Sequence, residues 1–124
     1  MRVRERITVA AWLETEGSIS CSRARAGSNY GVRVTIGQME KAPLAWLHKR
    51  IGGSFMRRQD NGYYRLRLSG KQAIAVLEEV LPYFISPNKR AQAILAIELG
   101  IGETKASPAR QLEIKEELHQ LKRR

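Results

Sequence analysis

The chain has 124 residues, about the length of one domain, and its 43% hydrophobic and 27% charged composition is typical of a folded globular protein. No apolar run approaches the roughly 20 residues that a membrane span requires, and one cysteine excludes an internal disulfide and a cysteine-built zinc site. The net charge of +10 points to a polyanionic partner, most commonly nucleic acid. We therefore expect a single domain over residues 1–124 that acts inside the cell in a reducing compartment, either the cytoplasm and nucleoid or an organelle, and is neither secreted nor bound to a membrane.

The positive charge is concentrated in one part of the chain. Residues 17–77 contain eleven Lys and Arg against only two acids, a net charge of +9, whereas the rest is close to neutral. An anionic membrane would be the rival partner, but it normally recruits a basic amphipathic helix. Because this segment has mostly the pattern of strands, we expect it to contact nucleic acid.

The first half of the chain predicts a helix and a hairpin followed by a second helix. The apolar run from Ile7 predicts a helix that ends at Gly17, a usual helix stop. Strands are predicted over 18–26 and 30–38, joined by a Gly-Ser-Asn turn. A short amphipathic helix follows, with Pro43 in its first turn and a stop at Gly52-Gly53.

The second half predicts another hairpin and three helices. Strands over 55–59 and 63–68 flank Asn61-Gly62, the strongest short-range hairpin signal. Ser69, Ser86 and Ser107 are predicted to cap helices that run to about 81, 99 and 121, the last within a C-terminal helical extension over 103–124.

The alternation within the strands predicts a sheet with one apolar and one basic polar face. Apolar side chains such as Val32, Val34 and Ile36 would cover helices. The opposite face would carry side chains of the types that read base edges and grip phosphates, with no acid except Asp60 at a hairpin tip. A solvated basic face is the alternative reading. The predicted DNA-contacting residues are Ser20, Ser22, Asn29, Arg33, Thr35, Arg57, Gln59, Arg65 and Arg67.

One segment has a recognisable motif. The run Val-Ala-Ala-Trp-Leu-Glu-Thr-Glu-Gly over residues 9–17 resembles the LAGLIDADG motif of homing endonucleases, and Ser18-Ile19 extends the match. The small and acidic positions and the closing glycine are kept. The sequence departs from the motif in its first and third residues and in having Glu at both acidic positions, so the last carboxylate keeps its charge on an arm one methylene longer. The layout of helices and hairpins is similar to that of the family over most of the chain.

The resemblance implies an α+β fold of order α-β-β-α-β-β-α. Its antiparallel or mixed four-stranded sheet would form a saddle, with helices on one face and DNA on the concave other. A chain with one motif would pair with a copy of itself through the motif helix, giving a homodimer on a partly palindromic double-stranded site. The interface residues expected from the motif are Val9, Ala10, Ala11, Leu13 and Glu14, although the apolar ones also fit a core position.

The resemblance also implies a site for phosphodiester hydrolysis. Glu16, the last motif acid, would be the catalytic carboxylate and the ligand of Mg²⁺ or Mn²⁺, with no small-molecule cofactor. Glu14 would have a structural role. Gln38 matches a polar residue that orients water at the metal, with a strand-end hydrogen bond as its alternative. Lys89, with Arg90 next to it, matches a basic residue near the cleaved phosphates.

The function implied is site-specific cleavage of double-stranded DNA in intron or intein homing. One alternative is a non-cleaving DNA- or RNA-binding protein on the same scaffold, such as a maturase or a transcription regulator. A small basic interaction protein is another, but it predicts scattered basic residues. Glu16 and Gln38 discriminate between cutting and binding, because a pure binder has no reason to keep an acid beside a phosphate.

Overall fold

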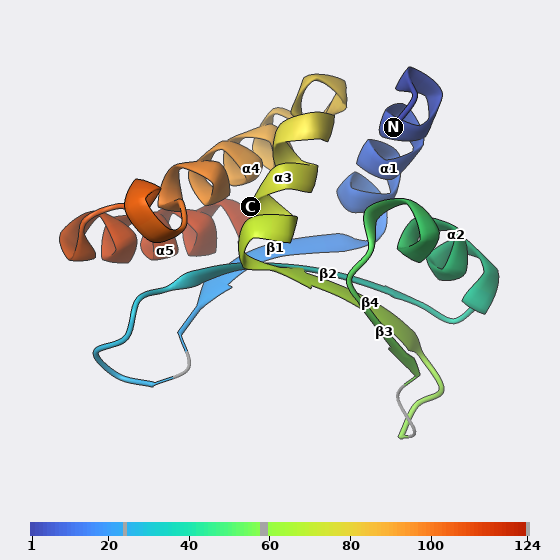
Figure 1. Cartoon of the computed structure of the whole chain (residues 1–124), viewed down its shortest axis with the longest axis horizontal. Helices are drawn as coiled ribbons and strands as arrows, with labels where there is room; N and C mark the ends of the chain where they lie inside the picture. The colour runs from blue at the N-terminus through green and yellow to red at the C-terminus, as the bar shows by residue number, and fades with distance from the viewer. Residues whose placement is uncertain (24, 58–59, 124) are drawn as a thin grey trace.

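The computed structural model describes residues 1–23, 25–57 and 60–123. It contains one four-stranded sheet with the helices packed on one of its faces, as Figure 1 shows. In chain order the elements are α1 (Val3–Glu16), β1 (Gly17–Ser22), β2 (Gly31–Gln38), α2 (Lys41–Ile51), β3 (Ser54–Arg57), β4 (Tyr64–Ser69), α3 (Gly70–Val80), the short turn η1 (Leu81–Tyr83), α4 (Pro87–Leu99), the turn η2 (Gly102–Thr104) and α5 (Pro108–Lys122). Within the described ranges, no helix is long and apolar enough to cross a membrane.

The sheet is antiparallel throughout, with strand order β1-β2-β4-β3. Both hairpins bend away from the helical layer, so that the uncovered face is concave (Figure 1). The predicted α+β architecture, its element order and the placement of the helices on one face are therefore confirmed.

The core lies between the sheet and the helices. Alternate residues of the two central strands are almost fully buried, among them Val34, Ile36 and Leu66. Helix α5 is built into this core, since Ile114 and Leu118 have exposed fractions of 0% and 2%. The C-terminal helix thus packs with the rest of the domain, against α4 and the edge strand β1.

Helix α1 passes directly into β1 at Gly17. The backbone there is extended, with φ −96°, so the glycine does not end the helix in the left-handed conformation that helix stops usually adopt. A Cβ at this position would lie 2.7 Å from the carbonyl oxygen of Leu13 and 2.8 Å from its Cα. Gly17 is therefore required by close approach between backbone segments, because any side chain would collide with the last turn of the helix.

Two of the three predicted serine caps are made by side chains. Ser86 Oγ accepts a hydrogen bond from the Lys89 amide at 3.1 Å, and Ser107 Oγ accepts one from the Arg110 amide at 3.2 Å. Ser69 occupies the N-cap position of α3, but its side chain makes no capping bond. That prediction is right in position and wrong in mechanism.

Candidate functional site

The concave face of the sheet is polar and basic. The strand register places Arg33 opposite Ser20 on one side and Ser69 on the other, and Thr35 opposite Arg67. In the described strands this face carries no acid. It consists of Ser18, Ser20, Ser22, Gly31, Arg33, Thr35, Gly37, Ser54, Met56, Arg65, Arg67 and Ser69.

The arginines of this face are free to bind a ligand. Among the described residues, no acid forms an ion pair with Arg33, Arg65 or Arg67. The Nε of Arg67 is buried and has no hydrogen-bond partner in the described part of the chain. A buried donor without an acceptor costs roughly 1–3 kcal/mol, so this arginine carries a penalty already present in the free protein.

Two predicted members of the concave face lie elsewhere. Arg57 pairs with Tyr64 across the β3–β4 ladder, and its guanidinium lies 5.6 Å from the Tyr64 ring centre, on the face shared with Phe55. Asn29 precedes β2, and its Oδ1 accepts a hydrogen bond from Gln111 of α5 at 3.1 Å, which holds it toward the helical layer. The expectation that both share the face of Arg33 is wrong. Predicted Gln59 lies outside the described residues.

Glu16 ends α1 at the point where the chain enters the sheet. Its side chain is exposed, and no described residue forms a hydrogen bond or ion pair with its carboxylate. A negative charge is unfavourable at a helix C-terminus, where the carbonyl groups already place partial negative charge. The position is thus better suited to binding a cation than to stabilising the helix.

Glu14, two residues earlier, is fully engaged in the fold. Its Oε1 accepts a hydrogen bond from the Ile85 amide at 2.7 Å, and its Oε2 accepts one from the Ser86 amide at 2.9 Å. These bonds tie α1 to the turn that begins α4. The structural role expected for this carboxylate agrees with its contacts.

The other two predicted catalytic side chains lie at the same end of the sheet as Glu16. Lys89, in the first turn of α4, donates from Nζ to the carbonyl oxygen of Gly17 at 3.1 Å. Gln38 lies two residues beyond Ile36, the ladder partner of Gly17. Its Oε1 accepts a hydrogen bond from the following amide at 2.8 Å, which is the strand-end bond expected as the alternative, and its Nε2 bonds to no described residue.

The environment of Lys89 is cationic and partly desolvated. Burial lowers the pKa of Lys89, the positive charge of Lys122 lowers it further, and the negative charge of Glu14 opposes both. Lys122 donates from Nζ to Ser18 Oγ at 3.0 Å. Lys122 was not among the predicted site residues, because the charge outside residues 17–77 is nearly balanced; the available signal was its seven-residue spacing from Lys115 on one helix.

The exposed surface of α1 differs from the predicted dimer interface. Val9, Ala10 and Leu13 have exposed fractions of 0% and belong to the core of their own chain, so their assignment to a surface between chains is wrong. Ala11 is exposed as expected. The outward face of α1 also carries Val3, Ile7, Thr8 and Thr15, and a shallow groove runs from Ile7 to Glu16.

A metal would find a sparse set of ligands in one chain. Within the described residues, no group of three or more His, Cys, Asp and Glu side chains is placed to hold an ion. Glu16 supplies an exposed carboxylate without a partner among the described residues, next to the first residue of the sheet. Such a donor suits Mg²⁺, which is usually held by one or two carboxylates together with water and substrate phosphate.

The fold is similar to those of homing endonucleases of known structure. Homing endonuclease I-CvuI, in complex with its target in the presence of calcium, matches with a TM-score of 0.79 and 23% identity over 95% of this chain and 82% of that chain. The archaeal intron-encoded homing endonuclease I-Vdi141I, complexed with DNA, gives a TM-score of 0.78 and 17% identity over 95% and 84% of the two chains. The LAGLIDADG homing endonuclease I-LtrWI, bound to target DNA, gives 0.64 and 13% over 76% of this chain and 35% of that one.

No protein-family model and no curated protein matches the sequence. The structural likeness confirms the resemblance that the motif at residues 9–17 indicated. The chain has the fold of the LAGLIDADG homing endonucleases.

Proposed function

We propose that this protein is a homodimeric, metal-dependent endonuclease that cuts double-stranded DNA at a specific, partly palindromic site, as in intron or intein homing. The observation that carries the proposal is the position of Glu16. Its exposed carboxylate, which has no partner among the described residues, ends the motif helix at the rim of a basic face whose described strands carry no acid, next to the residue whose carbonyl binds Lys89. A protein that only binds DNA gains nothing from a carboxylate there, because it repels phosphate.

Three residues of each chain have separate roles in the proposed reaction. Glu16, together with phosphate oxygens and the Glu16 of a second copy, would hold Mg²⁺ or Mn²⁺. When bound, the metal neutralises charge on the phosphate and activates water for in-line attack. Lys89 places an ammonium group beside the same phosphate, and the free Nε2 of Gln38 is available to orient the attacking water.

The concave face supplies specificity. Arg33, Arg65 and Arg67 lie on neighbouring strands without internal ion partners among the described residues, so their guanidinium groups are available to guanine edges in the major groove.

Pairing of two copies is proposed through the outward face of α1. Ala11 is small, and the hydroxyl groups of Thr8 and Thr15 already donate to the helix backbone, at 2.9 Å in both cases, so the surface has few unmet hydrogen bonds. Exposed Val3 and Ile7, with exposed fractions of 54% and 50%, would be covered by a second α1. This arrangement would bring two Glu16 residues to the centre of one DNA site, and a two-fold axis would make that site palindromic.

The test begins with duplexes selected by the full-length protein from a random-sequence library. We expect wild type to cut a selected duplex on both strands when Mg²⁺ is added, and Glu16→Gln to bind it as tightly or more tightly without cutting. Glu78→Gln, which removes an exposed carboxylate from α3, is the matched control and should cut normally. Binding without cutting by wild type would favour the non-cleaving alternative, and normal cutting by Glu16→Gln would refute the site.

A further inference from the structure

Two lysines from different helices converge on the first residues of β1. Lys89 Nζ donates to the Gly17 carbonyl at 3.1 Å, and Lys122 Nζ donates to Ser18 Oγ at 3.0 Å. Both side chains line one cleft of about 380 Å³ that also includes Gly17 and Ser18. The fold thus brings the end of α5 to the residues that directly follow Glu16.

Neither ammonium group is held in an ion pair by a described acid. The nearby Glu14 carboxylate already accepts two backbone hydrogen bonds. Burial, and next the charge of Lys122, lower the pKa of Lys89, while the charge of Glu14 raises it by less than they lower it. Like charges in a partly desolvated cleft repel one another, so an anion between them would stabilise both.

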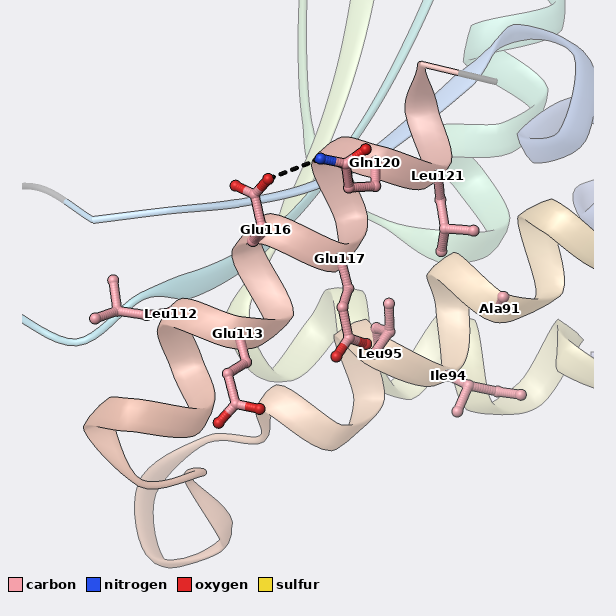
Figure 2. Close-up of a pocket in the computed structure, with 9 residues that line it drawn as sticks. All are labelled: Ala91, Ile94, Leu95, Leu112, Glu113, Glu116, Glu117, Gln120 and Leu121. Atoms are coloured by element: carbon pink, nitrogen blue, oxygen red, sulfur yellow. Dashed lines mark hydrogen bonds between the residues drawn. The ribbon is translucent and has the colours of Figure 1, made fainter.

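The distribution of charge on α5 agrees with an anion on this side of the helix. Lys115 and Lys122 lie seven residues apart, on the same helical face, and line a cleft against Ser20 of β1. Figure 2 shows the opposite face, where glutamates border an apolar groove of about 840 Å³ between α4 and α5. Those acids are Glu113, Glu116 and Glu117, of which Glu116 also lines the cleft of Lys115 and Lys122. The side of α5 that faces the sheet edge thus carries Lys115 and Lys122 with one acid, Glu116, whereas Glu113 and Glu117 border only the groove against α4.

The Lys89–Lys122 cleft also contains an unsatisfied buried group. Gln92 has an exposed fraction of 5%, its Nε2 donates to Asn88 Oδ1 at 2.7 Å, and its Oε1 has no hydrogen-bond partner in the described part of the chain. Since buried carbonyl oxygens are nearly always bonded, a water in the cleft would satisfy it. The cleft therefore has a polar lining with a free acceptor and two cations, which suits a hydrated phosphate group better than an apolar ligand.

We propose that Lys122 and Lys89 form a two-cation subsite that binds one backbone phosphate of the DNA next to Glu16. The inference rests on the proposed function and adds Lys122, delivered by the C-terminal helix, to the residues that hold the substrate. Lys122 supplies charge at the phosphate without forming or breaking a bond. It contributes to DNA binding and stabilises the negative charge of the transition state, because negative charge shifts among the phosphate oxygens during hydrolysis.

The test compares Lys122→Gln and Lys122→Arg with Lys49→Gln, which removes an exposed cation from the outer surface of α2. Binding to mixed-sequence duplex DNA is measured over a range of salt concentrations. Lys122→Gln should flatten the dependence of log K on log salt by about 0.9 per subunit, Lys122→Arg should restore it, and Lys49→Gln should leave it unchanged. A wild-type slope in Lys122→Gln would overturn the proposal.

Two further readouts separate this subsite from the endonuclease proposal. In free Lys122→Gln, an NMR titration should show the pKa of Lys89 moved up toward the ordinary lysine value, which a purely structural role would not produce. On a selected duplex with Mg²⁺, the single-turnover rate should fall about 10- to 100-fold. If wild type binds DNA without cutting, the endonuclease proposal fails, while the salt slope and the titration still decide the phosphate subsite. A Lys89 pKa that is the same in Lys122→Gln as in wild type would count against a shared site of the two lysines.

Discussion

The two motif acids offer a direct test of the site, because they carry the same charge two residues apart and have different surroundings. Glu14 accepts backbone hydrogen bonds from Ile85 and Ser86, whereas Glu16 is exposed and unpaired among the described residues. We expect Glu14→Ala to destabilise the fold, and Glu16→Ala to leave its stability unchanged or slightly raised.

The magnitude follows from these contacts. Hydrogen bonds to a charged group contribute about 1.5–3 kcal/mol each, but Ile85 is 89% exposed, so water replaces much of that one. Glu14→Ala should therefore cost about 2–3 kcal/mol, which for a chain of this length corresponds to a Tm lowered by about 8–12 °C. Glu16→Ala removes a charge that opposes the helix dipole, which is worth about 0.3–1 kcal/mol at most.

The assay is urea unfolding followed by circular dichroism, at one fixed protein concentration because a dimer's stability depends on it. Glu14→Gln, which keeps one neutral acceptor, should fall between wild type and Glu14→Ala. Equal stability of the Glu14→Ala and Glu16→Ala variants would refute the division of roles between the two carboxylates.

Three other substitutions test separate parts of the structure. Ala11→Trp should block close approach of two α1 helices and abolish the dimer in light scattering, so a dimer of wild-type size would count against pairing through this surface. Arg67→Met should raise the stability of the free protein, because it removes a buried donor without a partner. It should also relax the preference for one base pair in each half-site by about 1–3 kcal/mol. An equal loss of affinity for all single-base variants of the site would exclude base reading by Arg67. Gly17→Ala should destabilise the fold by about 1–3 kcal/mol, since its Cβ would lie 2.7 Å from the Leu13 carbonyl oxygen, and unaltered urea unfolding would contradict that packing.

Local patterns in the sequence were sufficient to predict the elements. Period-two alternation at Val32, Val34 and Ile36 predicted a strand with a buried face, and the Ser-Pro pairs at Ser86 and Ser107 predicted two capped helix starts. Such signals depend on neighbouring residues alone. The motif added the position of Glu16 at a helix end, because its spacing from Gly17 is fixed by the chain.

The alternation of side chains along a strand could have corrected the prediction that Arg57 lies on the concave face. Arg57 has the same parity as apolar Phe55, so alternation alone places both on one face, and the ladder with Tyr64 agrees. Asn29 is different, because the alternating pattern extends back to it although the strand begins at Gly31; only the contact with Gln111, more than 80 residues away along the chain, determines where its side chain lies.

Packing between distant segments decided the rest. An apolar helix residue fits a core and an interface equally well by pattern, and only the way α1 packs on the sheet shows that Val9 and Leu13 belong to the core while Ala11 faces outward. The approach of Lys122 to Ser18 depends on the angle at which α5 crosses β1, and no local signal encodes that angle. The sequence by itself determined the elements, the basic strands and the carboxylate at the helix end. The tertiary structure decided which helix faces are buried and which cations lie near that carboxylate. Both depend on contacts between residues that are far apart in the chain.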